Sequence, residues 1–289
     1  MKFKITVVLT VVLELISLEL SSQNFVDIAN INYTHGSSKN PNRIVINLKA
    51  PVVLKNKDIL LLSGEYHELT MPLKNYNPLQ GGNLVAGYQK NIGEGNSIFL
   101  AAINRFQQEK GGNLMDAYQL GGIVIATIQK SERFKYKFGA YYNQELFGTF
   151  MVPLFGFDWK PNKQWNFYGT LPISANIAYS PTEKFVTGIS FKGTVATYTM
   201  NTNKHLYTHR VTNEAFAFAD FYLTPSLVFQ CKAGHTFGRN FKTFSTNDKM
   251  NLAISSVKVG DNRPIQEEYK TDSWLLQGAL IYRYSLTKK

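Results

Sequence analysis

Apolar and polar residues alternate with a period of two along much of this chain, and few folds accept that pattern. In residues 133–148, RFKYKFGAYYNQELFG, the aromatic residues of one parity include Phe134, Tyr136, Phe138 and Tyr142. Two lysines of the opposite parity, Lys135 and Lys137, lie between them. Successive side chains of a β-strand point to opposite faces. A soluble sheet would bury these aromatics in a core, whereas a transmembrane barrel would turn them to lipid and the lysines to a wet lumen.

The same alternation recurs in other segments. Residues 274–286 place Trp274, Tyr282 and Tyr284 on one parity and Arg283 on the other. In segments 43–49, 185–195 and 227–237, basic residues oppose an apolar stripe; these are Arg43, Lys49, Lys192 and Lys232. Strands of about 9–11 residues with aromatics toward their ends suit a bilayer crossing.

Short and long connections alternate along the chain. Short polar joints are expected at 55–57, 93–96, 131–132, 161–163, 181–183 and 224–225. Longer loops are expected at 70–82, 107–117, 200–205 and 239–272. One exception is the GTLP segment, 169–172, a short connection that the alternation places on the side of the long loops. This pattern predicts about 14 strands. That number is even, as in single-chain bacterial barrels. If 164–180 forms one bent strand, the count becomes about 12.

The chain has 289 residues and contains no Pro/Gly/Ser-rich linker, which favours one domain. Near the N-terminus, Lys2 and Lys4 precede the apolar run ITVVLTVVL, and Ser21-Ser22 precedes Gln23. This pattern predicts a secretory signal peptide over residues 1–22, followed by a single outer-membrane β-barrel domain over 23–289. The lone cysteine, Cys231, excludes an intramolecular disulfide.

Three features favour a barrel over a soluble β-sandwich. The polar parity mixes lysine, serine and asparagine with glycine and tyrosine, as a narrow wet lumen accepts. Trp159, Trp165 and Trp274 lie toward expected strand ends, where aromatic belts meet the membrane surface. The alternation of short and long loops is natural for a meander closed around an axis, and closure also removes unpaired sheet edges, which lipid cannot solvate. We therefore expect an all-β fold, an antiparallel transmembrane β-barrel.

A family resemblance agrees with this fold. Its features in residues 138–180 are Tyr142-Asn143, Phe147-Gly148, Val152-Pro153-Leu154, Asp158-Trp159, Trp165 and Leu171-Pro172. The segments DIANINYTHGSS and LKAPVVLKNKD are similar to the family's opening strands. The chain resembles an uncharacterised outer-membrane β-barrel family of Bacteroidota-type bacteria, known only as a domain of unknown function. The resemblance implies the bacterial outer membrane as location and implies no activity.

Candidate catalytic groups do not assemble into a known pattern. His205 and His209 would be roughly 13 Å apart in a strand, too far to share one metal. His235 is followed by threonine and phenylalanine, with no serine nucleophile or orienting acid beside it. Glu145 and Asp158, in adjacent expected strands, are better explained as partners of Lys135, Lys137 or Lys160 than as an acid–base pair. We expect no enzyme activity, no cofactor and no metal site.

The net charge of +11 leaves an anion preference as the main functional indication. The lumen-facing basic candidates are Arg43, Lys49, Lys135, Lys137, Lys192, Lys232 and Arg283. The lipid-facing or girdle candidates are Phe134, Tyr136, Phe138, Tyr142, Trp274, Tyr282 and Tyr284. Basic rings in a pore favour anions, and replacement of Lys137 by glutamate is expected to leave folding intact and to change ion preference.

Three functions stay open from the sequence. The first is a small-solute channel with a basic, anion-favouring lumen. The second is a closed barrel with a structural or surface-binding role through the 239–272 loop, and the third is an outer-membrane lipid-modifying enzyme. The expected partners are outer-membrane lipid, the barrel assembly machinery and small anionic solutes. Nucleic acid is not an expected partner, and the sequence leaves the oligomeric state open.

Overall fold

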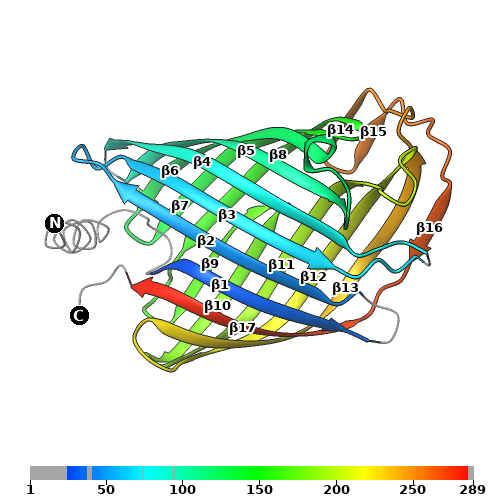
Figure 1. The fold of residues 1–289 in the computed structure, drawn as a ribbon. Helices are drawn as coiled ribbons and strands as arrows, with labels where there is room; N and C mark the ends of the chain where they lie inside the picture. Colours follow the sequence, from blue (N-terminus) through cyan, green and yellow to red (C-terminus); the bar gives the residue numbers. More distant parts are fainter. Residues whose placement is uncertain (1–24, 38–40, 74, 94, 286–289) are drawn as a thin grey trace, which may run out of the picture.

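The computed structural model describes residues 25–37, 41–73, 75–93 and 95–285, and it contains a closed antiparallel β-barrel of 14 strands (Figure 1). The barrel strands are β1 (Phe25–Gly36), β2 (Arg43–Val53), β3 (Ile59–Leu69), β4 (Leu79–Gly93), β5 (Asn96–Glu109), β6 (Tyr118–Ser131), β7 (Phe134–Glu145), β8 (Gly148–Trp159), β9 (Trp165–Leu171), β10 (Ser174–Thr182), β11 (Phe185–Thr199), β12 (Leu206–Tyr222), β13 (Leu227–Ser245) and β17 (Trp274–Ser285). The expectation of about 14 strands is confirmed, and the alternative of 12 is wrong because β9 and β10 are separate strands.

Each barrel strand pairs with its neighbours in the chain, and the last strand pairs with the first. The ring closes where β17 runs antiparallel to β1, from Phe25 opposite Ser285 to Gly36 opposite Leu275. On the other side, β17 pairs with β13 from His235 opposite Trp274 to Leu227 opposite Tyr282. Such closure satisfies the backbone groups of both edges, which a membrane environment requires.

The two ends of the barrel differ in the length of their connections. At one end, called the turn end, the connections are 54–58, 94–95, 132–133, 160–164, 183–184 and 223–226. At the opposite end, called the loop end, they are 37–42, 70–78, 110–117, 146–147, 172–173, 200–205 and 246–273. The first residue of β1 and the last residue of β17 both lie at the turn end (Figure 1).

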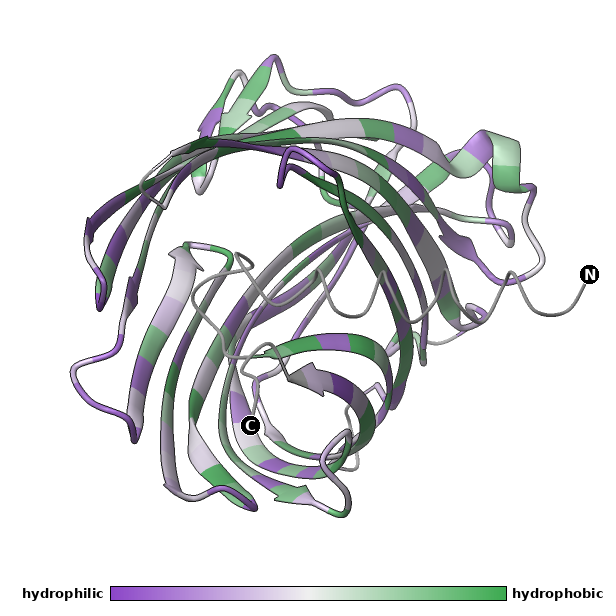
Figure 2. Ribbon diagram, turned by 90° about the vertical axis from the view of Figure 1, so that its left-hand side faces the viewer, coloured by the Kyte–Doolittle hydropathy of each residue, from purple (hydrophilic) through white to green (hydrophobic). Residues whose placement is uncertain are grey.

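Side chains of alternate parity face outward and inward along the strands. The outward parity is strongly apolar, with exposed residues that include Leu62, Leu84, Leu100, Phe155, Ile189 and Leu276. Figure 2 views the barrel from its turn end and shows green and purple residues alternating along ribbons that follow a flattened ring. Because water would not favour so much exposed apolar surface, the exterior suits an apolar medium.

The wall has a notch at the loop end, because β9 and β10 are short. β9 pairs with β8 only from Phe155 to Trp159, so the first half of β8 has no partner in β9. A hairpin from the 246–273 connection takes this place: β14 (Leu252–Ile254) pairs in parallel with Thr149–Met151 of β8, and β15 (Val257–Val259) pairs with β14. The hairpin therefore extends the wall into the notch.

The hairpin copies the inside–outside alternation of the wall that it extends. Ile254, Val257 and Val259 are exposed, as the outward parity of the barrel is, whereas Ala253 is buried. Gly148 allows the close fit at the start of β8: it has a φ of 123°, and a Cβ there would lie 2.5 Å from the Met250 carbonyl oxygen. A glycine is needed at such a position.

The loop end of β11 reaches across the ring to strands that are far away in barrel order. Thr199 of β11 forms a parallel bridge with Gln108 of β5, and the Tyr198 hydroxyl lies 3.0 Å from Nε2 of His67 on β3. The backbone N–H groups of Asn201 and Thr202 donate to the Glu109 carboxylate, each at 2.7 Å. These contacts draw the opposing walls together at the loop end.

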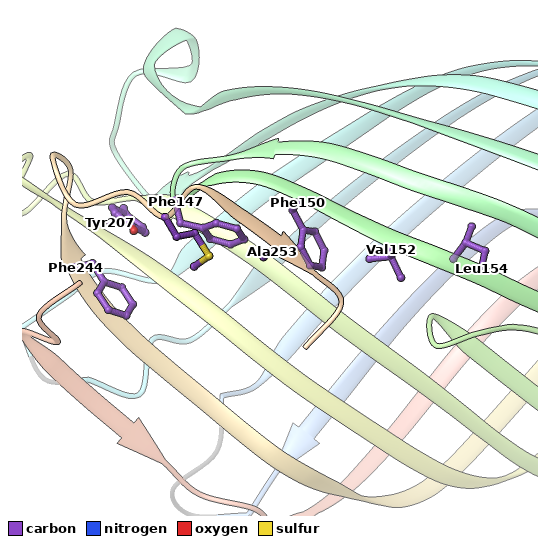
Figure 3. Packing of buried hydrophobic residues seen from close by; sticks show 8 residues of the cluster. Phe147, Phe150, Val152, Leu154, Tyr207, Phe244 and Ala253 are labelled. Carbon is purple, nitrogen blue, oxygen red and sulfur yellow. The ribbon is translucent and has the colours of Figure 1, made fainter. Parts of the chain in front are cut away.

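Two buried apolar clusters fill this end of the barrel. The first contains Phe147, Phe150, Val152, Leu154, Tyr207, Phe244, Met250 and Ala253, and it lies between β8, β14 and the ends of β12 and β13 (Figure 3). The second contains Leu69, Met71, Leu79, Ala196, Tyr198, Met200 and Phe241. A smaller third cluster, Val228, Ala279 and Ile281, lies between β13 and β17 toward the turn end.

Several sequence-based expectations need correction or lie outside the structure. The 239–272 loop is shorter than expected, because β13 continues to Ser245 through pairing with the start of β12 at Leu206. Its remainder is partly ordered as β14, β15 and β16 (Glu267–Lys270), and β16 pairs with β13. The signal peptide predicted for residues 1–22 falls outside the described residues. In the described part of the chain, which contains one short helix, η1 (Leu114–Ala117), no helix could cross a membrane.

Candidate functional site

A cavity of about 890 Å³ with both polar and apolar lining residues lies inside the barrel. Its wall includes residues of β1 to β5 on one side and of β10 to β13 on the other, such as Asn32, Asn47, Asn83, Asn176 and Gln230. Toward the loop end the same cavity meets the first apolar cluster at Phe147, Phe150 and Val152. The volume is in the range of small-molecule binding sites, about 300–1,000 Å³.

Positive charge dominates the cavity wall. Among the described lining residues six side chains are cationic: Arg43, Arg105, Lys192, Arg210, Lys232 and Lys258. The lining carboxylates within that same set are Glu65 and Glu214. The lining therefore contains more cationic side chains than carboxylates, and the cationic side chains differ in whether they form an ion pair.

The arginines are held by buried ion pairs. Arg43 donates two hydrogen bonds to the Glu214 carboxylate, at 2.8 and 2.9 Å, and Nη2 of Arg210 lies 3.9 Å from the same group. Arg105 forms an ion pair of 2.5 Å with Glu145, which lies outside the cavity wall. Nε of Arg43 and of Arg210 has no hydrogen-bond partner within the described residues. Both Nε atoms are buried, with almost no accessible surface.

Two lysines of the cavity form no ion pair with a carboxylate in the described residues. Neither Lys192 of β11 nor Lys232 of β13 has a carboxylate within ion-pair distance in the described ranges. Nζ of Lys232 lies 5.9 and 5.8 Å from the ring centres of Phe216 and Phe218, a cation–π arrangement. Lys192 is the more exposed of the two and lines the cavity directly. Both ammonium groups can attract an anion.

The remaining basic candidates from the sequence lie outside this cavity. Lys137 forms an ion pair of 2.7 Å with Asp158, whose side chain is buried. Arg283 is also buried and bridges Asp27 at 2.6 Å and Asp220 at 2.9 Å. Lys135 is buried on β7, and Lys49 is exposed near the turn end of β2.

The aromatic candidates lie on the outer surface or at its margins. Tyr136, Phe138, Tyr142, Trp274 and Tyr282 are exposed, with 46% of Phe138 accessible, and Phe134 and Tyr284 are partly exposed. The three tryptophans stand at strand ends: Trp159 and Trp165 at the turn end and Trp274 at the loop end. Tryptophans therefore stand near both ends of the barrel wall.

The two carboxylates that the sequence singled out serve in structural ion pairs. Asp158 pairs with Lys137, one of the expected partners. Glu145 instead binds Arg105, and it also accepts hydrogen bonds from Asn143 at 2.9 Å and from the Thr197 hydroxyl at 2.5 Å. Arg105 was missed, although its parity on β5 is the inward one opposite the exposed Ile98 and Leu100.

The histidines do not form a catalytic or metal centre. His209 is buried against Phe147, with ring centres 4.9 Å apart, whereas His205 is exposed in the connection before β12. His235 packs between Phe237 and Trp274. No group of three or more His, Cys, Asp or Glu side chains in the described ranges could hold a metal ion. Cys231 is exposed on the outward parity of β13.

Arg263 anchors the 246–273 connection over the loop end of the barrel. Its guanidinium lies over the Phe244 ring at 4.1 Å and donates to the Tyr207 hydroxyl at 2.8 Å. It also donates to both carboxylate oxygens of Asp261, at 2.7 and 3.0 Å. The hydrogen bonds from Arg263 hold the pKa of Asp261 well below its ordinary value. We call this set the Arg263 latch: Arg263, Asp261, Tyr207 and Phe244.

Comparison with solved structures finds barrels of low sequence identity. The structure titled "NanC porin structure in rhombohedral crystal form" is similar with a TM-score of 0.43 and 9% identity, over 88% of this chain and 98% of that chain. CdiB from Acinetobacter baumannii is similar with a TM-score of 0.35 and 10% identity, over 91% of this chain and 60% of that chain. No curated protein sequence matches the chain.

A comparison with protein families is more specific. The model of the family described as a domain of unknown function (DUF6268) matches residues 105–254, from the loop end of β5 to β14. The match includes the notch, Lys192, Arg210, Glu214 and Lys232, and it covers more than half of the sequence. The protein therefore belongs to the DUF6268 family.

Proposed function

We propose that this protein is an outer-membrane β-barrel that admits small anionic solutes to its lumen. The observation that carries the proposal is the charge of the cavity: Lys192 and Lys232 line it without a carboxylate partner in the described residues. A cavity with low-dielectric walls and one dominant sign of charge concentrates ions of the opposite sign. Passage of anions and exclusion of cations follow from the same field.

The proposed location rests on the exterior of the barrel. An apolar outward parity around a closed ring, with tryptophans near both ends, is suited to a bilayer and unsuited to water. Longer connections lie at one end, which in outer-membrane barrels is the extracellular one. The loop end would then face outward, and a Bacteroidota-type source remains part of the proposal, on the sequence resemblance alone.

The loop end would control access to the cavity. Its two apolar clusters and the Arg263 latch occupy the space through which a solute would pass along the barrel axis. We therefore expect a channel that is mostly closed, with rare openings, and not a wide permanent pore.

The test is electrical recording from the refolded protein in planar bilayers of neutral lipid under a potassium chloride gradient. We expect discrete openings whose reversal potential shows a preference for chloride. Lys192→Gln should reduce that preference, because it removes one positive charge from the cavity wall. Lys184→Gln is the matched control, since Lys184 lies in the connection between β10 and β11 and is exposed.

Cation preference, or an anion preference that Lys192→Gln does not change, would contradict the proposal. A folded barrel that never conducts would favour the alternative of a closed barrel that acts through its 246–273 connection. That alternative has one supporting observation, the extensive ordering of this connection on β8, β12 and β13. Lipid turnover by the purified protein would instead identify a lipid-modifying enzyme.

A further inference from the structure

Two hairpin tips face each other at the notch in the barrel wall. The β9–β10 hairpin ends at residues 172–173 and points toward the loop end. The β14–β15 hairpin has its tip at Ser255 and Ser256, and it points toward the turn end because β14 runs parallel to β8. Both tips line the same internal cavity, through Pro172, Ile173, Ser255 and Ser256.

The tips are joined by side-chain packing and not by a strand ladder. In the described residues, β15 pairs with β14 alone, and the backbone hydrogen bonds of the two tips go to their own neighbours. The N–H of Ser255 donates to the Met151 carbonyl at 2.8 Å, and the N–H of Gly193 donates to the Ile173 carbonyl at 2.9 Å. We call the line between the tips the seam.

Apolar side chains border the seam from both sides. Ile173 and Val195 pack against the cluster that includes Phe150, Val152 and Ala253. On the outer surface, Leu171, Ile254 and Val257 are exposed next to it. An apolar path therefore connects the cavity with the outer, lipid-facing surface, and separation of the tips would break no ladder hydrogen bond between them.

The interior end of this path is cationic. Lys192 lies one residue before Gly193, which hydrogen-bonds to the β9–β10 tip, and Lys258 follows the β14–β15 tip and lines the cavity. Lys258 has a carboxylate partner, Asp261 at 3.3 Å, whereas Lys192 has none in the part of the chain that the structure describes. One wall region thus places the Lys192 ammonium group beside the apolar side chains of the seam.

From this arrangement we propose that the ligand of the cavity is an anionic amphiphile that enters sideways through the seam. Its phosphate or carboxylate head would bind Lys192, and its acyl chain would leave between Ile173 and Ser256 into the bilayer. The proposal rests on the proposed anion-binding function and narrows its ligand class from small anions in general to anions that carry an alkyl chain.

The test uses photo-crosslinking in phosphatidylcholine vesicles with radiolabelled dodecyl phosphate. The full chain carries p-benzoylphenylalanine in place of Ser256 at the seam or, as the control, in place of Phe229, which is exposed on the outward parity of β13. We expect strong labelling from position 256 and only background from 229. Lys192→Gln should raise the dissociation constant of dodecyl phosphate by about tenfold, as expected for loss of a charged hydrogen bond, and labelling at position 256 should fall accordingly.

Competition distinguishes the ligand chemistry. Unlabelled dodecyl phosphate should abolish labelling at 256, whereas inorganic phosphate, which lacks the chain, and dodecanol, which lacks the charge, should not at the same concentration. Heat-dependent gel mobility verifies that each variant is folded.

Equal labelling at both positions, or labelling that Lys192→Gln leaves unchanged, would overturn lateral entry. Competition by inorganic phosphate as strong as that by dodecyl phosphate would overturn the amphiphile class while leaving the anion-binding function in place. If the bilayer recordings also show no dependence on Lys192, the proposed function fails together with this inference.

Discussion

At the scale of single residues, parity along a strand predicts the face of a side chain but not its partner. The sequence placed Arg43, Lys137 and Lys192 on one face, and the structure separates them by their contacts: Arg43 binds Glu214, Lys137 binds Asp158, and Lys192 has no carboxylate partner in the described ranges. Lys137→Glu would place a second carboxylate beside Asp158. Lys192, and not Lys137, is therefore the residue to change when ion preference is tested.

Phe138 tests the orientation of the strands. Its side chain is exposed on the outward parity of β7 and packs edge-on against Phe155, with ring centres 6.1 Å apart. Phe138→Arg should lower the free energy of unfolding by about 2–4 kcal/mol, the cost of an arginine near the bilayer midplane. Urea unfolding in phospholipid vesicles measures this, and Phe138→Leu should change it by less than about 1.5 kcal/mol. An unchanged stability of the arginine variant would contradict the outward, lipid-facing placement.

Glu145 tests the buried ion pairs inside the barrel. Its side chain has no accessible surface, and it binds Arg105, Asn143 and Thr197. Glu145→Gln leaves Arg105 buried without its counter-charge, so the free energy of unfolding should fall by about 3–5 kcal/mol. The same unfolding assay measures the effect, with Glu132→Gln as the control, because Glu132 is exposed in a turn. A loss similar to that of the control would show that water reaches this pair.

At the scale of elements, long strands were predictable and short ones were not. Strands of 11 or more residues, such as β2, β7 and β17, carry enough alternation to identify them. β14 and β15 have three residues each, too few for a periodic signal, and their place depends on the unpaired edge of β8 far away in sequence. The sequence therefore indicated a loop where the structure has part of the wall.

The Arg263 latch should hold the 246–273 connection in place. Arg263→Ala removes the hydrogen bonds to Tyr207 and Asp261 and the contact with the Phe244 ring. We expect more frequent channel openings in planar bilayers and faster amide exchange in residues 246–273. Lys270→Ala is the control, because the Lys270 side chain is 64% exposed on β16. Unchanged openings and exchange would show that the apolar cluster alone holds the connection.

The latch also predicts a dependence on pH. Arg263 lowers the pKa of Asp261 below its ordinary value of 3.8. A carboxyl group with a lowered pKa stabilises the folded state above the ordinary pKa, and this contribution is lost as pH falls through the lowered value. Opening frequency should therefore be constant between pH 5 and pH 8, in the range where the carboxylate stays ionised, and should rise only below pH 3.8. An opening transition near pH 6 would point to a different group.

At the scale of the whole molecule, the sequence predicted the ring and its two unequal ends but not the filling of the loop end. Alternation and turn chemistry are local, and they were enough for the strand number and the direction of each strand. The bridge between Thr199 and Gln108, and the contact of Tyr198 with His67, join strands on opposite sides of the ring. No local pattern encodes such contacts, so the filling of the loop end could not be predicted from the sequence.

The closed ring and the notch together predict the effect of removing the β14–β15 hairpin. Because β1 and β17 close the barrel without it, a variant with residues 251–259 replaced by a short Gly/Ser linker should still show heat-dependent gel mobility of a folded barrel. The variant loses the partner of Thr149–Met151, which leaves backbone groups of β8 unpaired at the membrane, so unfolding should become easier by about 3 kcal/mol or more. With the notch open, current through planar bilayers should rise and keep its anion preference through Lys192. Wild-type stability without added current would show that the hairpin only covers an already complete wall.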